Sequence, residues 1–492
     1  MSQSLFARLT RRFEPKSALE RREFLKLALA AAASFLASGP ELLATSSNGR
    51  RAARRVIVVG GGFAGLSCAH ELHRAGCRVT VLESRKRVGG RVLSLSDVVA
   101  GKMVEGGGEY IGSNHPTWLA YAHRFHLELF EGSADEDADQ PVILGGRRLD
   151  NKEAKALLEE MKVGNQRMNH DAAPVVADAP WTTSNAQALD RMNTAQWLRN
   201  LPVSRTCKLA LGSQLAANNG VALSRQSYLG NLSQVKGGGL EKYWTDSELY
   251  RCRGGNQRLA QKLAQTAGDL RLETPVTRIE IKSSGVVVHC ANGQALEADD
   301  VVLAVPPSVW GQIAFEPGLP HALRPQMGTV MKYLSTVKNA FWKQEHLGPN
   351  ASTDEMISMT WDGTEGQGSG RAVLTAFSGG PAAVASRRRW AWSGDRPFQE
   401  ILGRLYRGYS ENFLASRFMD WTNDPWTRAG YSFPAPREIT TLGPQLRAGQ
   451  GPLQFAGEHT CYKFVGYMEG ALDSGVAAAR RVLKQEAKSA AA

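Results

Sequence analysis

Cysteine is scarce in this chain: 492 residues contain six, and none stands in a C-x-x-C pair or at zinc-ligand spacing. We therefore expect six buried free thiols. The ten histidines form no H-E-x-x-H motif, so no metal site is predicted. A G-x-S-x-G turn and a G-x-x-x-x-G-K-S/T loop are also missing, which excludes the commonest hydrolase and NTPase signatures.

Positive charge is concentrated at one end of the chain. The formal net charge is +12, but residues 1–55 hold 11 Lys or Arg against four Asp or Glu, and the rest of the chain is only weakly basic. The charge therefore belongs to an N-terminal segment, and no nucleic-acid partner is predicted. The remaining composition is that of a globular protein, long enough for two or three domains.

The N-terminal segment has the pattern of an export signal. Charged residues precede an apolar run, Leu27–Ala37, that is about half the ~20 residues a membrane span needs, so no permanent span is expected. Arg21-Arg22 before this run resembles the twin-arginine signal, although Glu20 departs from it. The resemblance implies recognition by the twin-arginine translocation machinery and a periplasmic location. A basic amphipathic helix is the alternative.

A dinucleotide-binding pattern begins after residue 54. The β-branched run Val56–Val59 predicts a buried parallel strand, and Gly60-Gly61-Gly62-Phe63-Ala64-Gly65 follows it as a G-x-G-x-x-G. Gly60 would make the tight turn, Gly62 would let amides approach a pyrophosphate, and Gly65 would allow close helix–strand packing. After a helix and a second strand, Glu83 is placed to bind a ribose diol. A purely structural βαβ turn is the alternative reading.

Further motifs carry a family resemblance. Gly89-Gly90-Arg91 resembles the phosphate-contacting element of two-dinucleotide-binding flavoproteins, in which arginine is a bidentate phosphate donor. Five later segments narrow the resemblance to the flavin-containing amine oxidase family of monoamine and polyamine oxidases, which is related to L-amino-acid oxidases. These segments are Val104–Gly112, Gly254–Leu259, Val301–Pro307, Phe455–Thr460 and Gly466–Ala471.

This resemblance implies noncovalent FAD. Glu458 would lie near the ribityl chain and pyrophosphate, Val276 would meet the adenine, and a helix starting near Gly470 would stabilise the reduced flavin. Gly430 stands where some monoamine oxidases attach FAD through cysteine. The predicted cofactor-binding residues are Gly60, Gly62, Phe63, Ala64, Gly65, Glu83, Ser84, Arg85, Gly89, Gly90, Arg91, Gly107, Gly108, Glu109, Tyr110, Val276, Gly457, Glu458, Gly466, Tyr467 and Met468.

The resemblance also implies three catalytic residues. Lys332 falls where the family keeps a lysine bound through water to flavin N5; an exposed strand lysine is the alternative. Tyr431 and Tyr467 match the pair that flanks the amine, although either could be plain core. Glu109 could bind an ammonium group or only the backbone.

The predicted architecture is α/β, with a Rossmann-like FAD-binding domain assembled from discontinuous segments and an α+β substrate-binding domain. The predicted boundaries are 1–54 for the leader and linker; 55–130, 247–318 and 424–486 for the FAD-binding domain; 131–246 and 319–423 for the substrate-binding domain; and 487–492 for a tail. The insertions are expected to hold helices over Asp150–Met168 and Pro397–Asn412 and a strand over Val330–Val337, with Arg387–Arg389 in a solvated loop.

These features predict an exported FAD-dependent amine oxidase. Hydride would pass from the α-carbon of a small-molecule amine to flavin N5, the imine would hydrolyse to aldehyde and ammonia, and O2 would reoxidise the flavin to give H2O2. An L-amino-acid oxidase is the first alternative. The segment after Tyr110 lacks the arginine that such enzymes usually place there, although Arg428 could supply one. A desaturase-like flavoprotein and a redox partner without turnover are the others. Substrate identity and oligomeric state are left open.

Overall fold

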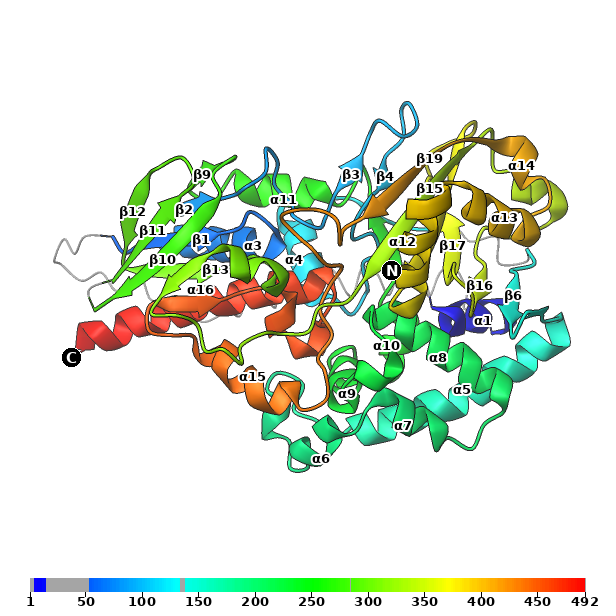
Figure 1. Ribbon diagram of the computed structural model, residues 1–492, viewed down its shortest axis with the longest axis horizontal. Helices are drawn as coiled ribbons and strands as arrows, with labels where there is room; N and C mark the ends of the chain where they lie inside the picture. The colour runs from blue at the N-terminus through cyan, green and yellow to red at the C-terminus, as the bar shows by residue number, and fades with distance from the viewer. Residues whose placement is uncertain (1–3, 15–52, 133–137, 284, 492) are drawn as a thin grey trace.

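The computed structural model describes residues 4–14, 53–132, 138–283 and 285–491 (Figure 1). Two lobes lie side by side. One is built around a parallel sheet and holds the C-terminal helix, and the other is built around a mixed sheet with helices on both faces.

The first lobe is organised by a five-stranded sheet in which every neighbouring pair is parallel. Its strands come from three separate stretches of the chain. In sheet order they are β20 (Leu453–Phe455), β13 (Asp300–Leu303), β1 (Arg55–Val59), β2 (Arg78–Leu82) and β9 (Asp269–Arg271).

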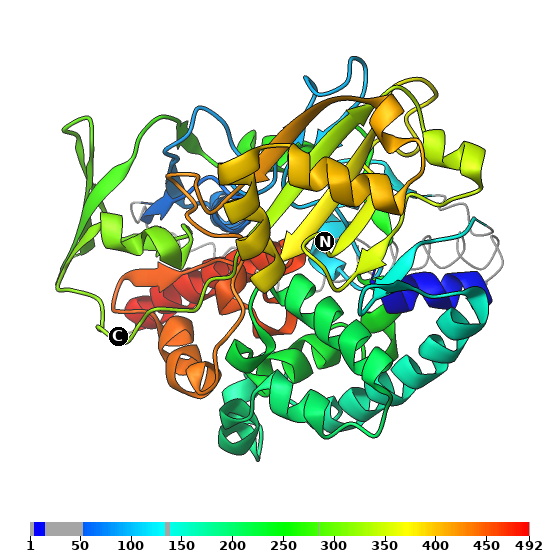
Figure 2. The ribbon, with the colours of Figure 1, turned by 45° about the vertical axis from the view of Figure 1, so that its right-hand side comes forward.

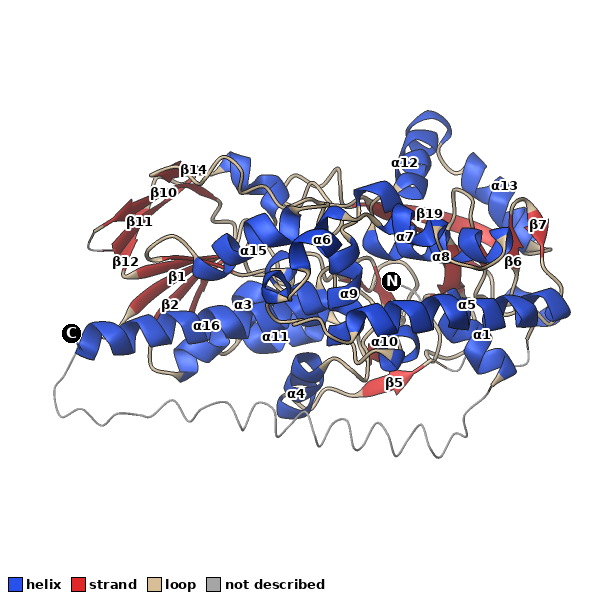
Figure 3. Ribbon diagram, turned by 90° about the horizontal axis from the view of Figure 1, so that it is seen from below, coloured by secondary structure: helices blue, strands red, loops and turns tan. Residues whose placement is uncertain are grey.

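Alternation along β1 explains how this sheet is covered. Val56 and Val58 pack into a core with the covering helices, whereas Ile57 and Val59 pack against a second, four-stranded sheet. Figure 3 shows the three layers. The helices are α3 (Phe63–Arg74), α4 (Pro116–Arg124), α11 (Gln257–Ala264) and α16 (Met468–Ala491); the second sheet is β12 (Ala295–Ala298), β11 (Gly285–Cys290), β10 (Val276–Lys282) and β14 (Ala314–Glu316).

The second lobe contains a seven-stranded mixed sheet. The predicted strand over Val330–Val337 is confirmed as β15. In sheet order the strands are β19 (Phe413–Asp420), β15, β18 (Ala372–Gly379), β17 (Met359–Asp362), β16 (Ser352–Thr353), β6 (Val142–Leu144) and β7 (Arg147–Arg148). There are also two short two-stranded sheets. One pairs β3 (Ser94–Leu95) with β4 (Val104–Glu105), and the other pairs β5 (Leu129–Glu131) with β8 (Tyr250–Cys252).

Helices cover both faces of the mixed sheet (Figure 2). On one side lie α12 (Pro381–Ser393), α13 (Arg396–Leu405) and α14 (Tyr409–Asn412). On the other lie α5 (Asn151–Ala172), α6 (Ala186–Arg191), α7 (Thr194–Arg199), α8 (Arg205–Asn219), α9 (Tyr228–Gly237) and α10 (Glu241–Asp246), with α15 (Glu438–Ala448) toward the first lobe.

Three local predictions need correction. The single helix predicted over Pro397–Asn412 is broken between α13 and α14, because Tyr406 is extended and Gly408 takes a positive φ of 79°. Arg387–Arg389 are not in a loop but in α12, where Arg387 pairs with Asp420 at 2.8 Å. The predicted tail over 487–492 continues α16 as helix through residue 491.

The sequence does not predict that residues 4–14, upstream of the twin-arginine-like pair, pack on the folded body. They form α1 (Leu5–Phe13), whose Leu5, Phe6 and Leu9 join the core that includes α5 and α8. Burial lowers the pKa of Arg8 to about 10, and its guanidinium donates to the Ala351 carbonyl at 3.1 Å.

The twin-arginine-like pair and the apolar run after it lie outside the described residues. Within the described part of the chain, none of the helices has the length and apolar character needed to cross a membrane. All six cysteines are buried and free, as predicted.

Candidate active site

A single large cavity collects the predicted site residues. The empty space within it and at its open mouth is about 1620 Å³. Of the residues predicted to bind cofactor or substrate, all except Gly65 line it. The predicted cofactor-binding and substrate-flanking residues thus lie around one continuous cavity.

The dinucleotide end is built by the turn between β1 and α3. Gly60 has φ of +110°, which favours glycine, and its N–H donates to the Leu82 carbonyl at 2.8 Å. Gly62 is the N-cap of α3, and no side chain accepts a hydrogen bond from the first amides of the helix. Phe63 and Ala64, the first two residues of the helix, line the cavity, so these uncapped amides lie beside it. This is the arrangement that binds phosphate.

Gly65 has the packing role expected of it. A Cβ there would stand 1.9 Å from the Gly60 carbonyl oxygen and 3.2 Å from Val58. Gly65 therefore lets α3 lie directly against β1, which explains why it is close to the cavity without lining it.

Glu83 and Arg85 mark the ribose side. The Glu83 carboxylate accepts hydrogen bonds from the amides of Gly61 at 2.7 Å and Arg85 at 2.8 Å, and burial raises its pKa. Each oxygen keeps acceptor capacity for a ribose hydroxyl. The Arg85 guanidinium is engaged by Asp424 at 2.7 and 2.9 Å.

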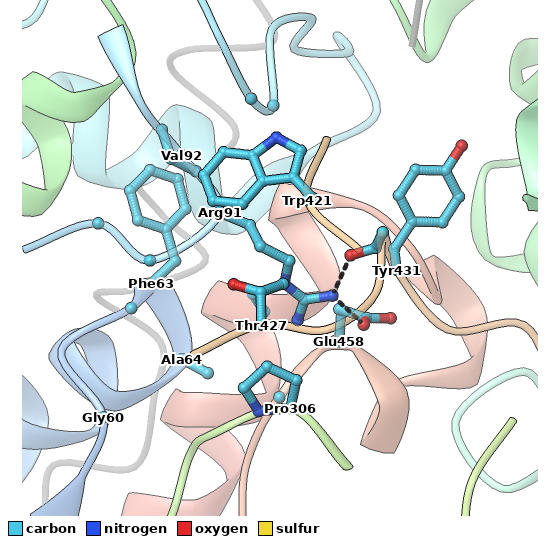
Figure 4. A pocket seen from close by; sticks show the side chains of 18 of the residues that line it. Gly60, Phe63, Ala64, Arg91, Val92, Pro306, Trp421, Thr427, Tyr431 and Glu458 are labelled. Carbon is cyan, nitrogen blue, oxygen red and sulfur yellow. Dashed lines mark hydrogen bonds and ion pairs between the residues drawn. The ribbon is translucent and has the colours of Figure 1, made fainter. Parts of the chain in front are cut away.

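Arg91 connects the dinucleotide motif to the closing motif (Figure 4). It donates to the Gly430 carbonyl at 2.8 Å and to the Glu458 carboxylate at 2.9 Å. Glu458 also accepts from the Ser432 hydroxyl at 2.6 Å and the Gly466 amide at 2.9 Å. Burial would raise the pKa of Glu458, but Arg91 and the other contacts lower it, so an ionised carboxylate joins the segments.

These donors fit a noncovalently bound FAD. The dinucleotide turn, the Glu83 carboxylate and Val276 at the start of β10 lie around one end of the cavity. The helix predicted near Gly470 begins at Met468, which also lines the cavity, so the positive end of the helix favours a reduced, anionic ring system. Among the described residues that line the cavity there is no cysteine or histidine to attach a flavin covalently.

Lys332 belongs to a buried ionic network. Alternation along β15 turns it to the cavity side of the sheet, where it is 5% exposed. Its Nζ donates to Glu109 at 2.7 Å and to the Glu105 carbonyl at 3.0 Å. An ammonium has three N–H groups, so one is left for a water or cofactor atom. The alternative of an exposed strand lysine is wrong.

Glu109 is held by the protein itself. Besides Lys332, its carboxylate accepts from Trp361 Nε1 at 2.8 Å and lies 3.2 Å from Arg251 Nε. Burial would raise the pKa of Glu109, but Lys332 and Arg251 lower it, so it is ionised. Of the two roles suggested by the sequence, the carboxylate does bind an ammonium group, that of Lys332, and its described contacts are with side chains rather than the backbone.

The two tyrosines form separate walls. Tyr431 donates to the Ala217 carbonyl at 3.1 Å, and its ring packs on Gly466, whose added Cβ would stand 3.2 Å away. Tyr467 packs on the His115 ring with centroids 5.5 Å apart. Within the described residues no ring contact joins the two tyrosines. Burial raises the pKa of both phenols, so they stay neutral.

Several cavity residues escaped the sequence analysis. Trp421, which donates to the Gly106 carbonyl at 3.0 Å, and Phe377 add aromatic surface, and Glu248 adds a carboxyl. No local motif marks them, since they come from three unrelated segments. Arg428, the suggested carboxylate binder, is exposed and not among the lining residues.

Comparison with known proteins identifies the family of this chain. A family model described as flavin containing amine oxidoreductase covers residues 63–483. This chain belongs to that family. Flavin-containing amine oxidase A of Sus scrofa is 28% identical over 456 residues, covering 86% of this chain and 83% of that protein. An L-amino acid dehydrogenase of Synechocystis is 25% identical over 452 residues, covering 86% and 93%.

A solved structure of putrescine oxidase bound to putrescine has a TM-score of 0.79 at 24% identity, covering 88% of this chain and 99% of that one. Membership in the flavin-containing amine oxidoreductases confirms the predicted family, the enzyme class and the FAD cofactor. The likeness to amine oxidase structures confirms the predicted α/β, Rossmann-like fold.

Proposed function

We propose that this amine oxidoreductase is an oxidase of primary amines. The observation that carries the proposal is the composition of the cavity. Tyr431 and Tyr467 wall it, and both arginines among its described lining residues are already engaged: Arg85 by Asp424 at 2.7 and 2.9 Å, and Arg91 by the Gly430 carbonyl at 2.8 Å and Glu458 at 2.9 Å. An amine without a carboxylate fits such a site.

The aromatic walls would affect the protonation state of the substrate amine. A primary amine with a pKa near 10.4 is protonated at pH 7, and freeing its lone pair costs about 4–5 kcal/mol. An apolar pocket between Tyr431 and Tyr467 disfavours the cation and reduces this cost. The ring faces still attract the incoming cation before it loses its proton.

The chain's own residues would position the reaction. FAD, when bound, supplies the acceptor for the hydride from the amine α-carbon. Tyr431 and Tyr467 would hold that carbon between them and exclude water. The Lys332–Glu109 pair would keep one N–H directed to the cavity, where it can order a water beside the flavin.

We expect aerobic turnover of phenethylamine to give phenylacetaldehyde, ammonia and H2O2 in equal amounts. The reason is that a neutral amine bound between the tyrosines is oxidised to an imine, which water hydrolyses, while O2 takes the electrons. A coupled peroxidase assay and ammonia determination measure the ratio. Amine consumption without peroxide would contradict an oxidase and indicate another electron acceptor.

An L-amino-acid substrate is the second candidate, favoured by the similarity to an L-amino acid dehydrogenase. The geometry argues against it. Arg251, a buried arginine near the cavity, lies 3.2 Å from Glu109 and donates to the Tyr110 hydroxyl at 2.5 Å, and its Nη1 has no hydrogen-bond partner among the described residues. Glu248 lines the cavity and Arg251 does not, so a substrate carboxylate would meet another carboxyl there.

We also propose that the protein is exported through the twin-arginine pathway to the periplasm, which the Arg21-Arg22 pair and the apolar run after it support. This pathway carries folded proteins, so FAD would be acquired before export.

Replacing Arg21 and Arg22 together by lysine is expected to abolish amine oxidase activity in the periplasm, because the translocation machinery recognises the arginine pair. Activity in periplasmic and cytoplasmic fractions measures the effect. In the matched control, Arg50 and Arg51, a second arginine pair in the same segment, are replaced by lysine. This variant should still be exported. Equal export of both variants would refute the proposal.

A further inference from the structure

Arg251 is a buried cation that contacts Glu109 but is not among the residues that line the cavity. It is the middle residue of β8. Its Nη2 donates to the Tyr110 hydroxyl at 2.5 Å and to the Asp362 carbonyl at 2.9 Å, and its Cζ lies 4.8 Å from the centre of the Tyr110 ring. These contacts hold the guanidinium with Nε 3.2 Å from the Glu109 carboxylate, as an ion pair without an aligned hydrogen bond.

The Glu109 carboxylate lies between two cations. Its Oε2 accepts from Lys332 Nζ at 2.7 Å, whereas its Oε1 accepts from Trp361 Nε1 at 2.8 Å and pairs with Arg251. Because each oxygen has its own partners, turning the carboxylate would break contacts on both sides. A fixed carboxylate also fixes the Lys332 ammonium, whose other hydrogen bond in the described part of the chain goes to the Glu105 carbonyl at 3.0 Å.

Arg251 also favours the ionised form of Glu109. Burial alone would raise the pKa of Glu109, and the charges of Lys332 and Arg251 lower it below its ordinary value. A buried lysine–glutamate pair without a second cation can lose both charges when the proton passes from Nζ to the carboxylate. A guanidinium does not lose its proton in proteins, so Arg251 opposes this transfer and keeps three N–H groups on Lys332.

Other carboxyls lie near this network, but none of those in the described part of the chain contacts both cations. The Glu105 carboxyl accepts from the Ser94 hydroxyl at 3.0 Å and from the Asn256 amide at 2.7 Å, and Lys332 donates only to its backbone carbonyl. Burial raises the pKa of each of these carboxyls, which are Glu105, Asp362 and Glu365. Glu109 is therefore the carboxylate that joins the two cations.

We propose that Arg251 is a positioning residue for the oxidation: through the Glu109 carboxylate it holds Lys332 as an ammonium with one N–H directed into the cavity. This inference rests on the proposed amine oxidase function and deepens it, because it adds a residue outside the cavity wall to those that the reaction needs. Arg251 does not line the cavity, so its effect on the flavin is transmitted by Lys332.

A double-mutant cycle on Arg251 and Lys332 tests this transmission. Arg251→Gln should slow the same flavin half-reaction as Lys332→Met, by about 10-fold, within the range of coupling energies for residues of one ion-pair network. The double variant should be no slower than Lys332→Met within about twofold, since the group through which Arg251 acts is already gone. Independent effects would instead multiply. Stopped-flow absorbance of the flavin measures each rate, and Tm reports any loss of stability.

Arg251→Lys separates positioning from folding. Lysine keeps a cation beside Glu109 but cannot make both hydrogen bonds of Nη2, so this variant should lose stability and yet recover most of the rate that Arg251→Gln loses.

Arg481→Gln is the matched control. Arg481 of α16 is also partly buried and donates to the Phe455 carbonyl at 2.7 Å and to Gln454 at 3.0 Å, but it does not line the cavity and has no contact with the Glu109 network. It should leave both half-reactions within about twofold, with and without Lys332→Met.

The oxidised flavin gives a readout that needs no substrate. Its visible absorption bands respond to hydrogen bonds and charge beside the ring. Arg251→Gln and Lys332→Met should therefore change these bands in the same direction, and Arg251→Lys should restore them.

Three outcomes would overturn the positioning role: rates that are unchanged in Arg251→Gln, effects that multiply in the double variant, or a loss that Arg251→Lys does not restore. The last would assign Arg251 to folding alone. Failure of every amine to bleach the flavin of the unsubstituted protein would refute the proposed function instead, and the absorption bands would still test Arg251.

Discussion

Replacing Lys332 by methionine is expected to lower kcat about 100-fold, the usual effect of removing a preorganised donor from an active site. Methionine keeps most of the side-chain volume but removes the ammonium that donates to Glu109 at 2.7 Å. It would leave the ionised Glu109 with only Arg251 and Trp361, and it would remove the N–H available on the cavity side. Stopped-flow measurement of flavin reduction and reoxidation shows which half-reaction slows.

Lys463→Met is the control for this prediction. Lys463 is also ion-paired, with Asp178 at 2.8 Å and Asp473 at 3.2 Å, but it does not line the cavity. We expect it to change stability and leave kcat within about threefold, as for other substitutions that do not touch the reacting groups. A Lys332→Met enzyme with unchanged rates in both half-reactions would show that the lysine is structural.

Replacing Gly65 by alanine is expected to yield a protein largely free of flavin. The new Cβ would stand 1.9 Å from the Gly60 carbonyl oxygen, so α3 must move away from β1 and its N-terminus from the phosphate position. Such overpacking costs about 1–3 kcal/mol or more. The ratio of flavin to protein absorbance after purification, together with Tm, measures both effects.

Gly311→Ala provides the comparison, since an added Cβ there meets nothing within 4 Å and the glycine has no positive φ. It should keep full flavin content and Tm. A fully flavinated Gly65→Ala protein of unchanged Tm would contradict the packing argument.

The cofactor end could be predicted from the sequence because its determinants are local. The positive φ of Gly60, the close approach at Gly65 and the carboxyl of Glu83 all fall within one strand–helix–strand unit. Steric and hydrogen-bonding demands of a dinucleotide fix the spacing of such residues, so the pattern can be read without knowing the fold.

The substrate end depends on contacts between distant segments. Glu109 meets Lys332 and Trp361, which follow it by 223 and 252 residues, so no local pattern could give its partners. Glu248 lines the cavity from an irregular stretch between α10 and β8, where no helix or strand pattern marks it.

The helix over Pro397–Asn412 was mispredicted for a different reason. Its apolar spacing continues across the break, so periodicity does not show that α13 ends at Leu405, where Tyr406 is extended and Gly408, the N-cap of α14, is left-handed. Periodicity describes which face is buried, whereas the helix end depends on one backbone conformation.

The central claim is that the cavity oxidises amines and discriminates against their carboxylated counterparts. Anaerobic mixing of the purified holoenzyme with matched pairs, phenethylamine against phenylalanine and tryptamine against tryptophan, tests it most directly through the bleaching of flavin absorbance. We predict rapid bleaching by the amines and none by the amino acids. Bleaching by the amino acids alone would contradict the account and require a carboxylate-binding arginine at the substrate end of the cavity.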